Sequence, residues 1–320
     1  MNAPIALSCG EPSGIGPEIV VKAWDTLRAD IPFVWIGDPS HLPQGTPVSC
    51  IAAPEEAAAA APDALPVLPL TFAAPALPGA PDPRNAAGVI ASIERAVALV
   101  QSGAASALCT APIHKKALID GAGFAYPGHT EFLADLAGVD HVVMMLASPS
   151  LRVVPATIHI PLADVPHALT PEVLRRTIEI TAQALHSQFG LAHPRIAVAG
   201  LNPHAGEGGA MGQEELTWIA PLVQELDGQG VTLTGPHPAD TLFHAAARRG
   251  YDAAIAMYHD QALIPINTLY FNRRVNVTLG LPFVRTSPDH GTAFDIAGKG
   301  IANPSSLIEA LRLAHRLGTA

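Results

Sequence analysis

Three histidines in this chain each come directly after a short apolar run. His159 ends the run VVPATIH, His204 follows IAVAGLNP, and His259 ends AAIAMYH. A buried strand would deliver each histidine to the carboxyl edge of a sheet, which is where open α/β folds bind ligands. Neutral imidazole suits zinc-like borderline metals, and three protein ligands with one open coordination position describe a catalytic metal site. We therefore expect a catalytic metal site formed by these three side chains.

The residue that follows His259 is Asp260, and three roles for it stay open. It is a metal ligand, an outer partner that orients an imidazole, or the cap of a turn. The chain contains 14 histidines, so any one of them alone would be weak evidence for a metal site. Three histidines that share one position relative to a strand are stronger evidence than any single one.

A second polar cluster is the segment GHTEFL, which has two interpretations. In the first it is the start of a helix, with Thr130 as the cap and Glu131 in the first turn. In the second it is a substrate site, in which His129 and Thr130 hydrogen-bond a polar or phosphorylated group.

Two other segments are rich in glycine. GEPSGIGPE resembles a loop that holds an anion at a helix N-terminus, but a tight strand-to-helix turn explains its glycines equally well. NPHAGEGGAMG, residues 202–212, is expected to be a loop because so much glycine holds neither a helix nor a strand. Glycine beside His204 favours a site there without indicating its chemistry.

Short apolar runs alternate with helical patterns along the chain, which predicts an α/β fold. A strand over 5–9 leads into a helix near Pro17, whose apolar stripe is Ile19, Val20, Ala23, Trp24 and Leu27. Further strands are predicted at 105–110, 142–147, 152–158, 195–201, 231–234, 253–258 and 275–281. Helices are predicted at 88–102, 171–189, 214–226, 239–249 and 305–317. Residues 52–83, rich in Ala and Pro, are expected to be a surface excursion with a short helix over 55–61.

The composition restricts the partners and the compartment. The chain has 18 Lys and Arg against 28 Asp and Glu, a net charge of −10, so no nucleic-acid partner is expected. No apolar run reaches the roughly 20 residues that cross a bilayer, and the N-terminus lacks the basic region of a signal peptide. We therefore expect no membrane association and a cytoplasmic location. Cys9, Cys50 and Cys109 have no CxxC spacing and are expected to be small buried residues.

The segment DHGTAFDIAGKGIANP, residues 289–304, is similar to the adenosine-binding loop of the isopropylmalate and isocitrate dehydrogenases. This resemblance implies that Asp295 binds the ribose hydroxyls of the cofactor. It also implies that Gly291, Gly298 and Asn303 belong to the cofactor site. An acidic contact to the ribose favours NAD over NADP, because a 2′-phosphate would be repelled.

Together with that loop, several further motifs identify a family. They are GEPSGIGPE, TAPIHK, PGHTEFLA, NPHAGEGG, PADTLF, YHDQALIP and VNVTLGLPFVRTSPDHGTA. With them nearly the whole chain resembles the 4-hydroxythreonine-4-phosphate dehydrogenase (PdxA) family. The resemblance implies an isopropylmalate-dehydrogenase-like α/β/α fold of two lobes with an intervening cleft. Lobe one would comprise residues 1–128 and 285–320, and lobe two residues 129–284.

The resemblance also implies a role for individual residues. His159, His204 and His259 match metal ligands, with His259 expected from the partner subunit of a homodimer that shares its active sites. Asp240 and Asp260 match acidic residues that support the site and are the candidates for catalysis. The substrate contacts would be His129, Thr130, Asn276 and Arg285, and a guanidinium suits a bidentate grip on carboxylate or phosphate.

One position departs from the family pattern. The family usually carries a lysine eight residues after the third metal histidine, where it contacts the substrate, but this chain has Asn267 in the sequence IPIN. Asparagine hydrogen-bonds without charge, so some affinity for the substrate anion would be lost. Arg273 or Arg274 could compensate from nearby. The departure bears on catalytic strength and substrate identity more than on fold.

The expected function is oxidation of 4-phosphohydroxy-L-threonine at C3 with NAD and one divalent metal per site. Decarboxylation would then give 3-amino-2-oxopropyl phosphate, in pyridoxal phosphate (vitamin B6) synthesis. Zinc, cobalt, nickel, manganese and magnesium stay open, and histidine ligands favour the others over magnesium. The alternatives are a paralogue acting on 4-phospho-erythronate, 4-phospho-threonate or a cyclic diol, a metal-dependent lyase or hydrolase that does not use NAD, and a catalytically silent binding protein.

Overall fold

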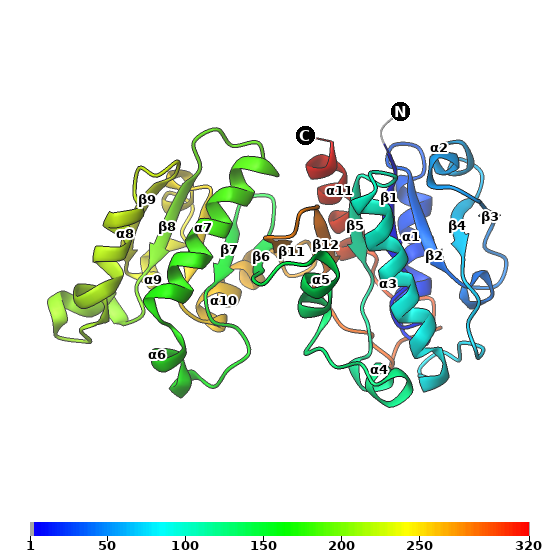
Figure 1. Cartoon of the computed structure of the whole chain (residues 1–320), viewed down its shortest axis with the longest axis horizontal. Helices are drawn as coiled ribbons and strands as arrows, with labels where there is room; N and C mark the ends of the chain where they lie inside the picture. Colours follow the sequence, from blue (N-terminus) through cyan, green and yellow to red (C-terminus); the bar gives the residue numbers. More distant parts are fainter. Residues whose placement is uncertain (1–2, 320) are drawn as a thin grey trace. The chain divides into compact units, whose positions relative to one another are not determined.

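The computed structural model describes residues 3–319 of the chain, and two compact units can be distinguished in it (Figure 1). Unit 1 comprises Met1–Val142 with Leu281–Ala320, and unit 2 comprises Val143–Gly280. Each unit has a sheet with helices on its two faces, which confirms the predicted α/β class. None of the helices in residues 3–319 is both long enough and apolar enough to cross a membrane.

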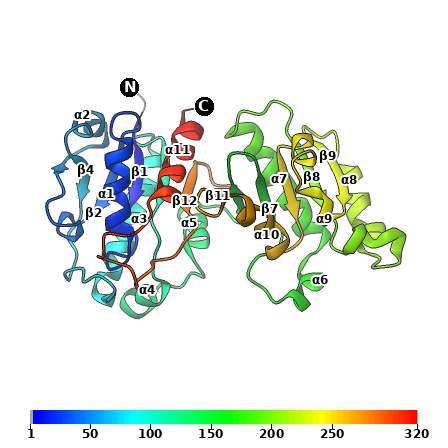
Figure 2. The same cartoon turned by 180° about the vertical axis from the view of Figure 1, so that it is seen from behind.

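The sheet of unit 1 has the strand order β3-β4-β2-β1-β5-β12, and its strands pair in parallel. In chain order these strands are β1 (Ile5–Ser8), β2 (Phe33–Gly37), β3 (Val48–Cys50), β4 (Leu65–Pro69), β5 (Ala107–Thr110) and β12 (Arg285–Pro288). The helices of unit 1 are α1 (Gly16–Leu27), α2 (Ala57–Ala60), α3 (Ala86–Gln101), α4 (Lys115–Ala122), α5 (His129–Ala137) and α11 (Ser305–Gly318). Helix α3 covers one face, whereas α1 and α11 cover the other (Figures 1 and 2).

Helix α1 forms as the sequence predicts. Pro17 occupies its first turn, where the missing amide costs no helical hydrogen bond. The predicted stripe is buried in full, and Trp24 also donates from Nε1 to the carbonyl of Ala61 at 2.8 Å. Before it, Gly10 has φ +69°, and a Cβ there would lie 2.5 Å from the carbonyl oxygen of Pro112. The turn between β1 and α1 therefore requires glycine at position 10.

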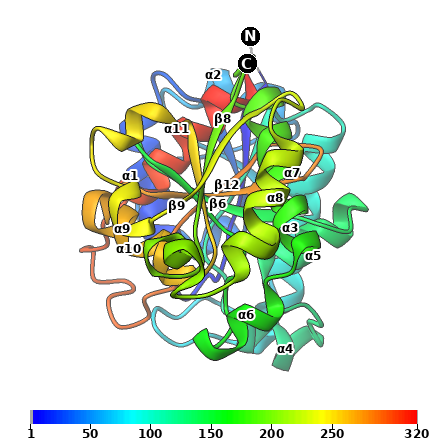
Figure 3. The same ribbon diagram turned by 90° about the vertical axis from the view of Figure 1, so that its left-hand side faces the viewer.

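The sheet of unit 2 has the strand order β11-β6-β7-β10-β8-β9, with β7, β10, β8 and β9 parallel and the pairs β11–β6 and β6–β7 antiparallel. These strands are β6 (Val143–Ala147), β7 (Arg152–Pro155), β8 (Arg195–Ala199), β9 (Thr232–His237), β10 (Ala253–Ala256) and β11 (Val275–Leu279). The helices are α6 (Val165–Ala168), α7 (Pro171–Ser187), α8 (Ala220–Leu226), α9 (Ala239–Leu242) and α10 (His259–Tyr270). Figure 3 shows α7 and α8 on one flank of β8 and β9, and α9 and α10 on the other.

The predicted helix over 239–249 is wrong. Helix α9 ends at Leu242, whose carbonyl accepts the Tyr251 hydroxyl at 3.0 Å. The ring Nδ1 of His244 then accepts the backbone N–H groups of Ala246 and Ala247, and a 3-10 turn follows over Ala247–Gly250. These side-chain contacts interrupt the helix that the pattern of 239–249 predicts.

Residues 52–83 are more than a surface excursion. A short helix does form near 55–61, as a 3-10 turn over Pro54–Glu56 followed by α2. The same segment also contributes β4, which the sequence reading missed and which lies between β3 and β2 in the sheet. Cys50, at the end of β3, is exposed, so the expectation of three buried cysteines is wrong for this one.

The division into units also differs from the predicted lobes. Residues 129–142 and 281–284 belong to unit 1 and not to the lobe of the metal residues. The reason is the packing of α5, which buries Phe132 and Leu133 in the core of unit 1. The ring of Phe132 contacts that of Phe124 edge-on, with centroids 5.2 Å apart.

The role of β4 can be tested with two leucines of the same segment. Leu65, in β4, has no exposed surface, whereas Leu77 is 63% exposed. We expect Leu65→Ala to lower the free energy of unfolding by about 2–5 kcal/mol, because it leaves a cavity in the core. Leu77→Ala should change it by less than about 0.5 kcal/mol. Urea denaturation followed by circular dichroism measures both, and equal effects would contradict a core strand at 65–69.

Candidate functional site

The three histidines follow strands that neighbour one another in unit 2. Strands β7, β10 and β8 are adjacent and parallel, so their carboxyl ends lie at one edge of the sheet. Just beyond β7 and β10, Thr157 donates from its hydroxyl to the carbonyl of Met257 at 2.7 Å. Two residues further along each chain segment come His159 and His259. The strands predicted before these histidines are confirmed, and Thr157 is a positioning contact that the sequence reading missed.

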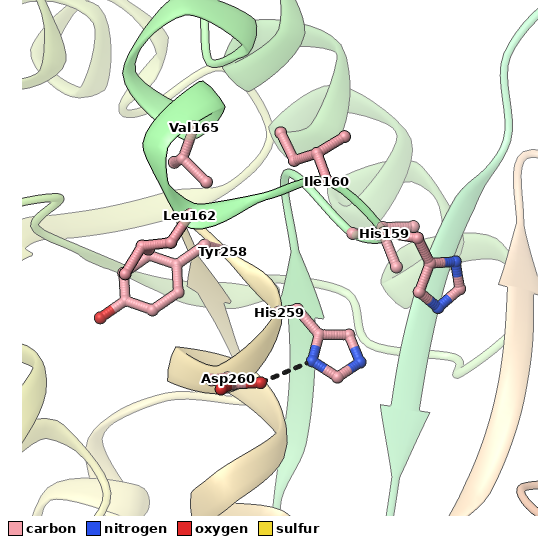
Figure 4. A pocket seen from close by; sticks show the side chains of 8 residues that line it. His159, Ile160, Leu162, Val165, Tyr258, His259 and Asp260 are labelled. Atoms are coloured by element: carbon pink, nitrogen blue, oxygen red, sulfur yellow. Dashed lines mark hydrogen bonds and ion pairs between the residues drawn. The ribbon is translucent and has the colours of Figure 1, made fainter.

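His159 and His259 face the same pocket, a cavity of about 300 Å³ in unit 2 (Figure 4). Their ring centroids are 5.7 Å apart with the planes inclined by 45°. Tyr258 and Asp260 also line this pocket. The remaining lining residues are apolar, namely Ile158, Ile160, Leu162 and Val165. Two imidazoles that face one pocket offer nitrogen donors of the kind that borderline metal ions prefer.

Carboxylates lie beside the rings of two of the histidines. Nδ1 of His259 lies 2.8 Å from the carboxylate of Asp260, as Figure 4 shows. Nδ1 of His204 lies 3.0 Å from the carboxylate of Glu207. A carboxylate accepts, so in the neutral ring of His259 Nδ1 carries the hydrogen and Nε2 keeps its lone pair. This is the tautomer that metal-binding imidazoles use, and it makes Asp260 an orienting partner of His259.

His204 lies apart from this pocket, in a loop of unusual conformation. Residues 204–208 all have left-handed φ values, +52° at His204, +51° at Ala205 and +44° at Glu207. Among residues 3–319 no group of three His, Cys, Asp or Glu side chains is arranged to hold one ion. One chain thus brings together two of the three predicted ligands, and the third stays a prediction.

A buried carboxylate holds this loop in place. Glu215, 3% exposed, accepts from the backbone N–H of Asn202 at 2.7 Å and from its side-chain amide at 3.0 Å. Gln261 links the neighbouring strand ends, donating to the carbonyl of Gly200 and accepting from the N–H of Met257. Left-handed conformations of residues other than glycine cost about 1–2 kcal/mol each, so such anchors are required. Neither anchor was predicted, because neither residue type signals a site by itself.

The other predicted residues of unit 2 are scattered along it. Asp240 is exposed in α9 and is not among the residues that line the pocket. Asn276 lies in β11 opposite Leu146 of β6. Asn267 lies in α10, two turns after His259, and its side-chain oxygen is buried without a hydrogen-bond partner. An unsatisfied buried amide oxygen is a natural contact for a donor group of a ligand.

Unit 1 contains the remaining predicted substrate contacts. Arg285, 3% exposed in β12, donates from Nη2 to the Thr110 hydroxyl at 2.6 Å. Burial lowers the pKa of Arg285 to about 10, so the guanidinium keeps its charge at neutral pH. Burial, and then the charge of Arg285, lower the pKa of His129 to about 3. A neutral imidazole beside a buried cation can hydrogen-bond an anionic group without repelling the cation.

The cluster GHTEFL is both a helix start and a position beside Arg285. Helix α5 begins at His129 with Gly128 as its N-cap, and no side chain caps it, so the interpretation of Thr130 as the cap is wrong. Glu131 does lie in the first turn. Nε2 of His129 is buried and makes no hydrogen bond, which leaves it for a ligand.

The adenosine-type loop runs along unit 1. Asp295 is exposed, and Gly298 has φ +73° with Pro78 so close that a Cβ would lie 2.6 Å from it. Asn303 accepts from the N–H and hydroxyl of Ser305 at the start of α11, a structural contact that the resemblance does not include. A Cβ added at Gly291 would have no atom within 4 Å. A cavity of about 410 Å³ lies beside the loop and is lined by Gly298, Gly300 and the turn after β1.

Comparisons with known proteins give consistent results. The family model "Pyridoxal phosphate biosynthetic protein PdxA" matches residues 29–314. A 4-hydroxythreonine-4-phosphate dehydrogenase of Ruegeria sp. (strain TM1040) is 73% identical over 313 residues, which cover 98% of this chain and 96% of the relative. The crystal structure of the Klebsiella pneumoniae enzyme of that name has a TM-score of 0.89 at 37% identity, covering 99% of this chain and 100% of that one. A terephthalate 1,2-cis-dihydrodioldehydrogenase from Burkholderia xenovorans LB400 has a TM-score of 0.69 at 29% identity, covering 99% and 98%.

The depressed pKa of His129 can be tested through the pH dependence of stability. A histidine in the unfolded chain binds its proton near pH 6.5, whereas in the folded protein the pKa of His129 is about 3. The unfolded state therefore gains protons as the pH falls from 6.5 towards 3, and the folded protein loses stability in that range. We expect the urea midpoint of His129→Asn to fall less steeply between pH 7 and pH 5 than that of the unchanged protein. Exposed His167→Asn is the control, and equal slopes for all three would contradict a buried neutral His129.

Proposed function

This chain belongs to the pyridoxal phosphate biosynthetic protein PdxA family, and we propose that it is an NAD-dependent and metal-dependent 4-hydroxythreonine-4-phosphate dehydrogenase. Its substrate would be 4-phosphohydroxy-L-threonine and its final product 3-amino-2-oxopropyl phosphate. The observation that carries the proposal is the pair His159 and His259, which face one pocket from neighbouring parallel strands.

The donor chemistry of this pocket fits a divalent metal. Imidazole nitrogens bind zinc, cobalt, nickel and manganese well, and Asp260 orients the ring of His259 for such a bond. His159, His204 and His259 would hold the ion. When bound, the ion would make the C3 hydroxyl of the substrate easier to deprotonate and the product ketone a better electron sink for decarboxylation.

Unit 1 offers the contacts for the anionic part of the substrate. Arg285 would hold a carboxylate or phosphate, and a buried guanidinium binds such groups through strong charge-assisted hydrogen bonds. His129 and Thr130, at the start of α5, would add hydrogen bonds without adding charge. Asn267 and Asn276 are the further substrate contacts that the family resemblance implies.

The reaction has two balanced parts. The C3–H bond breaks with its electron pair, which NAD accepts as hydride, and the C3 hydroxyl loses its proton. The bond between C2 and the carboxyl carbon then breaks, carbon dioxide leaves, and C2 takes up a proton. Asp240 and Asp260 are the candidates for moving these protons, and the contact of Asp260 with His259 favours an orienting role for that residue.

NAD is the cofactor that the loop of residues 289–304 favours. Asp295 would accept from the ribose hydroxyls, and its exposed carboxylate would repel the 2′-phosphate of NADP. Gly291, Gly298 and Asn303 are the further contacts that the family resemblance implies. The cavity of about 410 Å³ beside Gly298 offers room for the adenosine end of the dinucleotide.

A second candidate is a paralogue that oxidises a phosphorylated sugar acid or a cyclic diol. Asn267 favours it, because a neutral side chain stands where the family usually has a lysine. A structural neighbour at 29% identity, from B. xenovorans, is named as a dehydrogenase of a cyclic cis-dihydrodiol, which also supports this candidate. The relatives that share far more of the sequence favour the first candidate.

The substrate can be identified by one comparison. We expect metal-loaded protein to form NADH from 4-phosphohydroxy-L-threonine, with 4-phospho-D-erythronate and a cis-dihydrodiol as parallel samples. His259→Ala should lower turnover by at least about a hundredfold, because it removes a metal ligand. The exposed His167→Asn is a matched control. Turnover of erythronate or diol alone would replace the proposal by the second candidate.

We also propose that a homodimer shares its metal sites, because one chain collects two of the three ligands. Mixing inactive His204→Ala with inactive His259→Ala should then restore about a quarter of the activity, since half of the random dimers have one intact site. Size-exclusion chromatography with light scattering checks the dimer. No restoration, with mixed dimers shown by mass spectrometry, would contradict shared sites.

A second mixture locates His259. If His159 and His259 of one chain bind the same ion, mixing His159→Ala with His259→Ala restores nothing. If His259 comes from the partner, as the family resemblance implies, this mixture also recovers. The two mixtures together therefore assign each ligand to a subunit.

A further inference from the structure

Two side chains of α1 hold the backbone of the adenosine-type loop from outside. The carboxylate of Glu18 accepts the N–H of Ala302 at 2.8 Å and the N–H of Gly300 at 3.2 Å. The ammonium of Lys22 donates to the carbonyls of the same residues, at 2.7 Å for Ala302 and 2.9 Å for Gly300. Lys22 also donates to Glu18 at 2.8 Å. The ion pair of Glu18 and Lys22 thus binds both the backbone N–H and the backbone carbonyl of Gly300 and of Ala302.

This ion pair is suited to holding a loop rigidly. Glu18 is 7% exposed, and a carboxylate so buried is stable only when hydrogen bonds and an opposite charge compensate its lost hydration. Its partner stands one helical turn away on the same helix, so both charges are fixed by α1. Gly298 and Gly300 both have φ +73°, a conformation with little intrinsic restriction for glycine. The loop therefore depends on outside contacts for its position.

Gly300, one of the two held residues, borders the cavity of about 410 Å³. Glu18, Gly298 and Gly300 line it together with Pro12 and His41. A ligand in that cavity would lie against backbone that Glu18 and Lys22 keep in place. Fixing a wall before binding reduces the ordering cost that a ligand would otherwise bear.

We infer that Glu18 and Lys22 are a positioning pair for the cofactor site, holding residues 300–302 in the form that binds the adenosine end of NAD. This inference rests on the proposed function. Lys22 has three ammonium hydrogens and three acceptors, namely Glu18 and the carbonyls of Gly300 and Ala302. The lysine beside the loop therefore has no donor left for a 2′-phosphate, which agrees with NAD as the cofactor.

The test uses the full chain with Glu18→Gln, Lys22→Met and the double substitution. Asp25→Asn is the control, because Asp25 pairs with Arg28 at 3.6 Å on the same helix. Hydrogen–deuterium exchange of residues 298–304 is measured in cofactor-free protein, and NADH affinity is measured by fluorescence titration. We expect the loop amides to exchange about tenfold faster and NADH to bind about tenfold more weakly in both single variants, with kcat changed less than about threefold. The double variant should be little worse than either single one, because the two residues act as a unit.

Three results would overturn the inference. Unchanged exchange in Lys22→Met, with the folded state of the variant checked by circular dichroism, would show that the pair does not hold the loop. Faster exchange with unchanged NADH affinity would show that the held loop is not part of the cofactor site. Failure of the unmutated protein to bind NADH would remove the proposed function and the inference with it. That last failure is recognised in the unmutated protein, whereas the first two appear only in the variants.

Discussion

Parallel pairing of β7, β10 and β8 is the constraint on which the candidate metal site depends. Because these strands run in the same direction, the segments that follow them leave the sheet at a common edge. The hydrogen bond between Thr157 and Met257 keeps the ends of β7 and β10 in register beyond the last ladder pair. The separation of His159 and His259 is therefore set by backbone pairing rather than by the two side chains. An antiparallel pair would place the same residues at opposite edges.

Unit 1 holds charged side chains at positions from which water is largely excluded. Arg285 is buried and donates to the Thr110 hydroxyl, and the pKa of the nearby His129 is about 3, so this imidazole adds no positive charge beside the guanidinium at neutral pH. Glu18 and Lys22 compensate one another and use their remaining capacity on backbone groups. In one case the charge is that of a single buried guanidinium, and in the other a charge pair shapes the backbone.

The sequence predicts those parts of the structure that depend on local pattern. The stripe of α1 and the apolar runs before the three histidines are of this kind, since burial of one face or of a whole strand leaves a clear periodicity. Strand β4 was not predicted because its sequence, LPVLP, has proline at two positions. Only its pairing with β2 and β3 makes this segment a strand. Helix α10 was not predicted because it begins directly at His259 and contains Pro265, a residue that usually interrupts a helix.

In the candidate site, too, the sequence predicts local features but not the tertiary contacts. Residue type and position after a strand identify His159 and His259, but the role of Asp260 follows from a distance of 2.8 Å that no spacing predicts. Glycines in 202–212 predict a loop, whereas the left-handed run from His204 needs the contacts of Glu215 to exist. The sequence thus indicates which residues could act, and the tertiary contacts decide how each is held.

The cysteines have a practical consequence for experiments on this protein. Burial raises the pKa values of Cys9 and Cys109 to about 12, and both thiols are enclosed. Cys50 is exposed at the end of β3, on the edge strand of the unit 1 sheet. Because thiol reagents require an accessible thiolate, a maleimide dye or spin label would attach at Cys50 and leave the other two cysteines intact. The native chain thereby offers a single point for attaching a spectroscopic reporter, without any engineering of its cysteines.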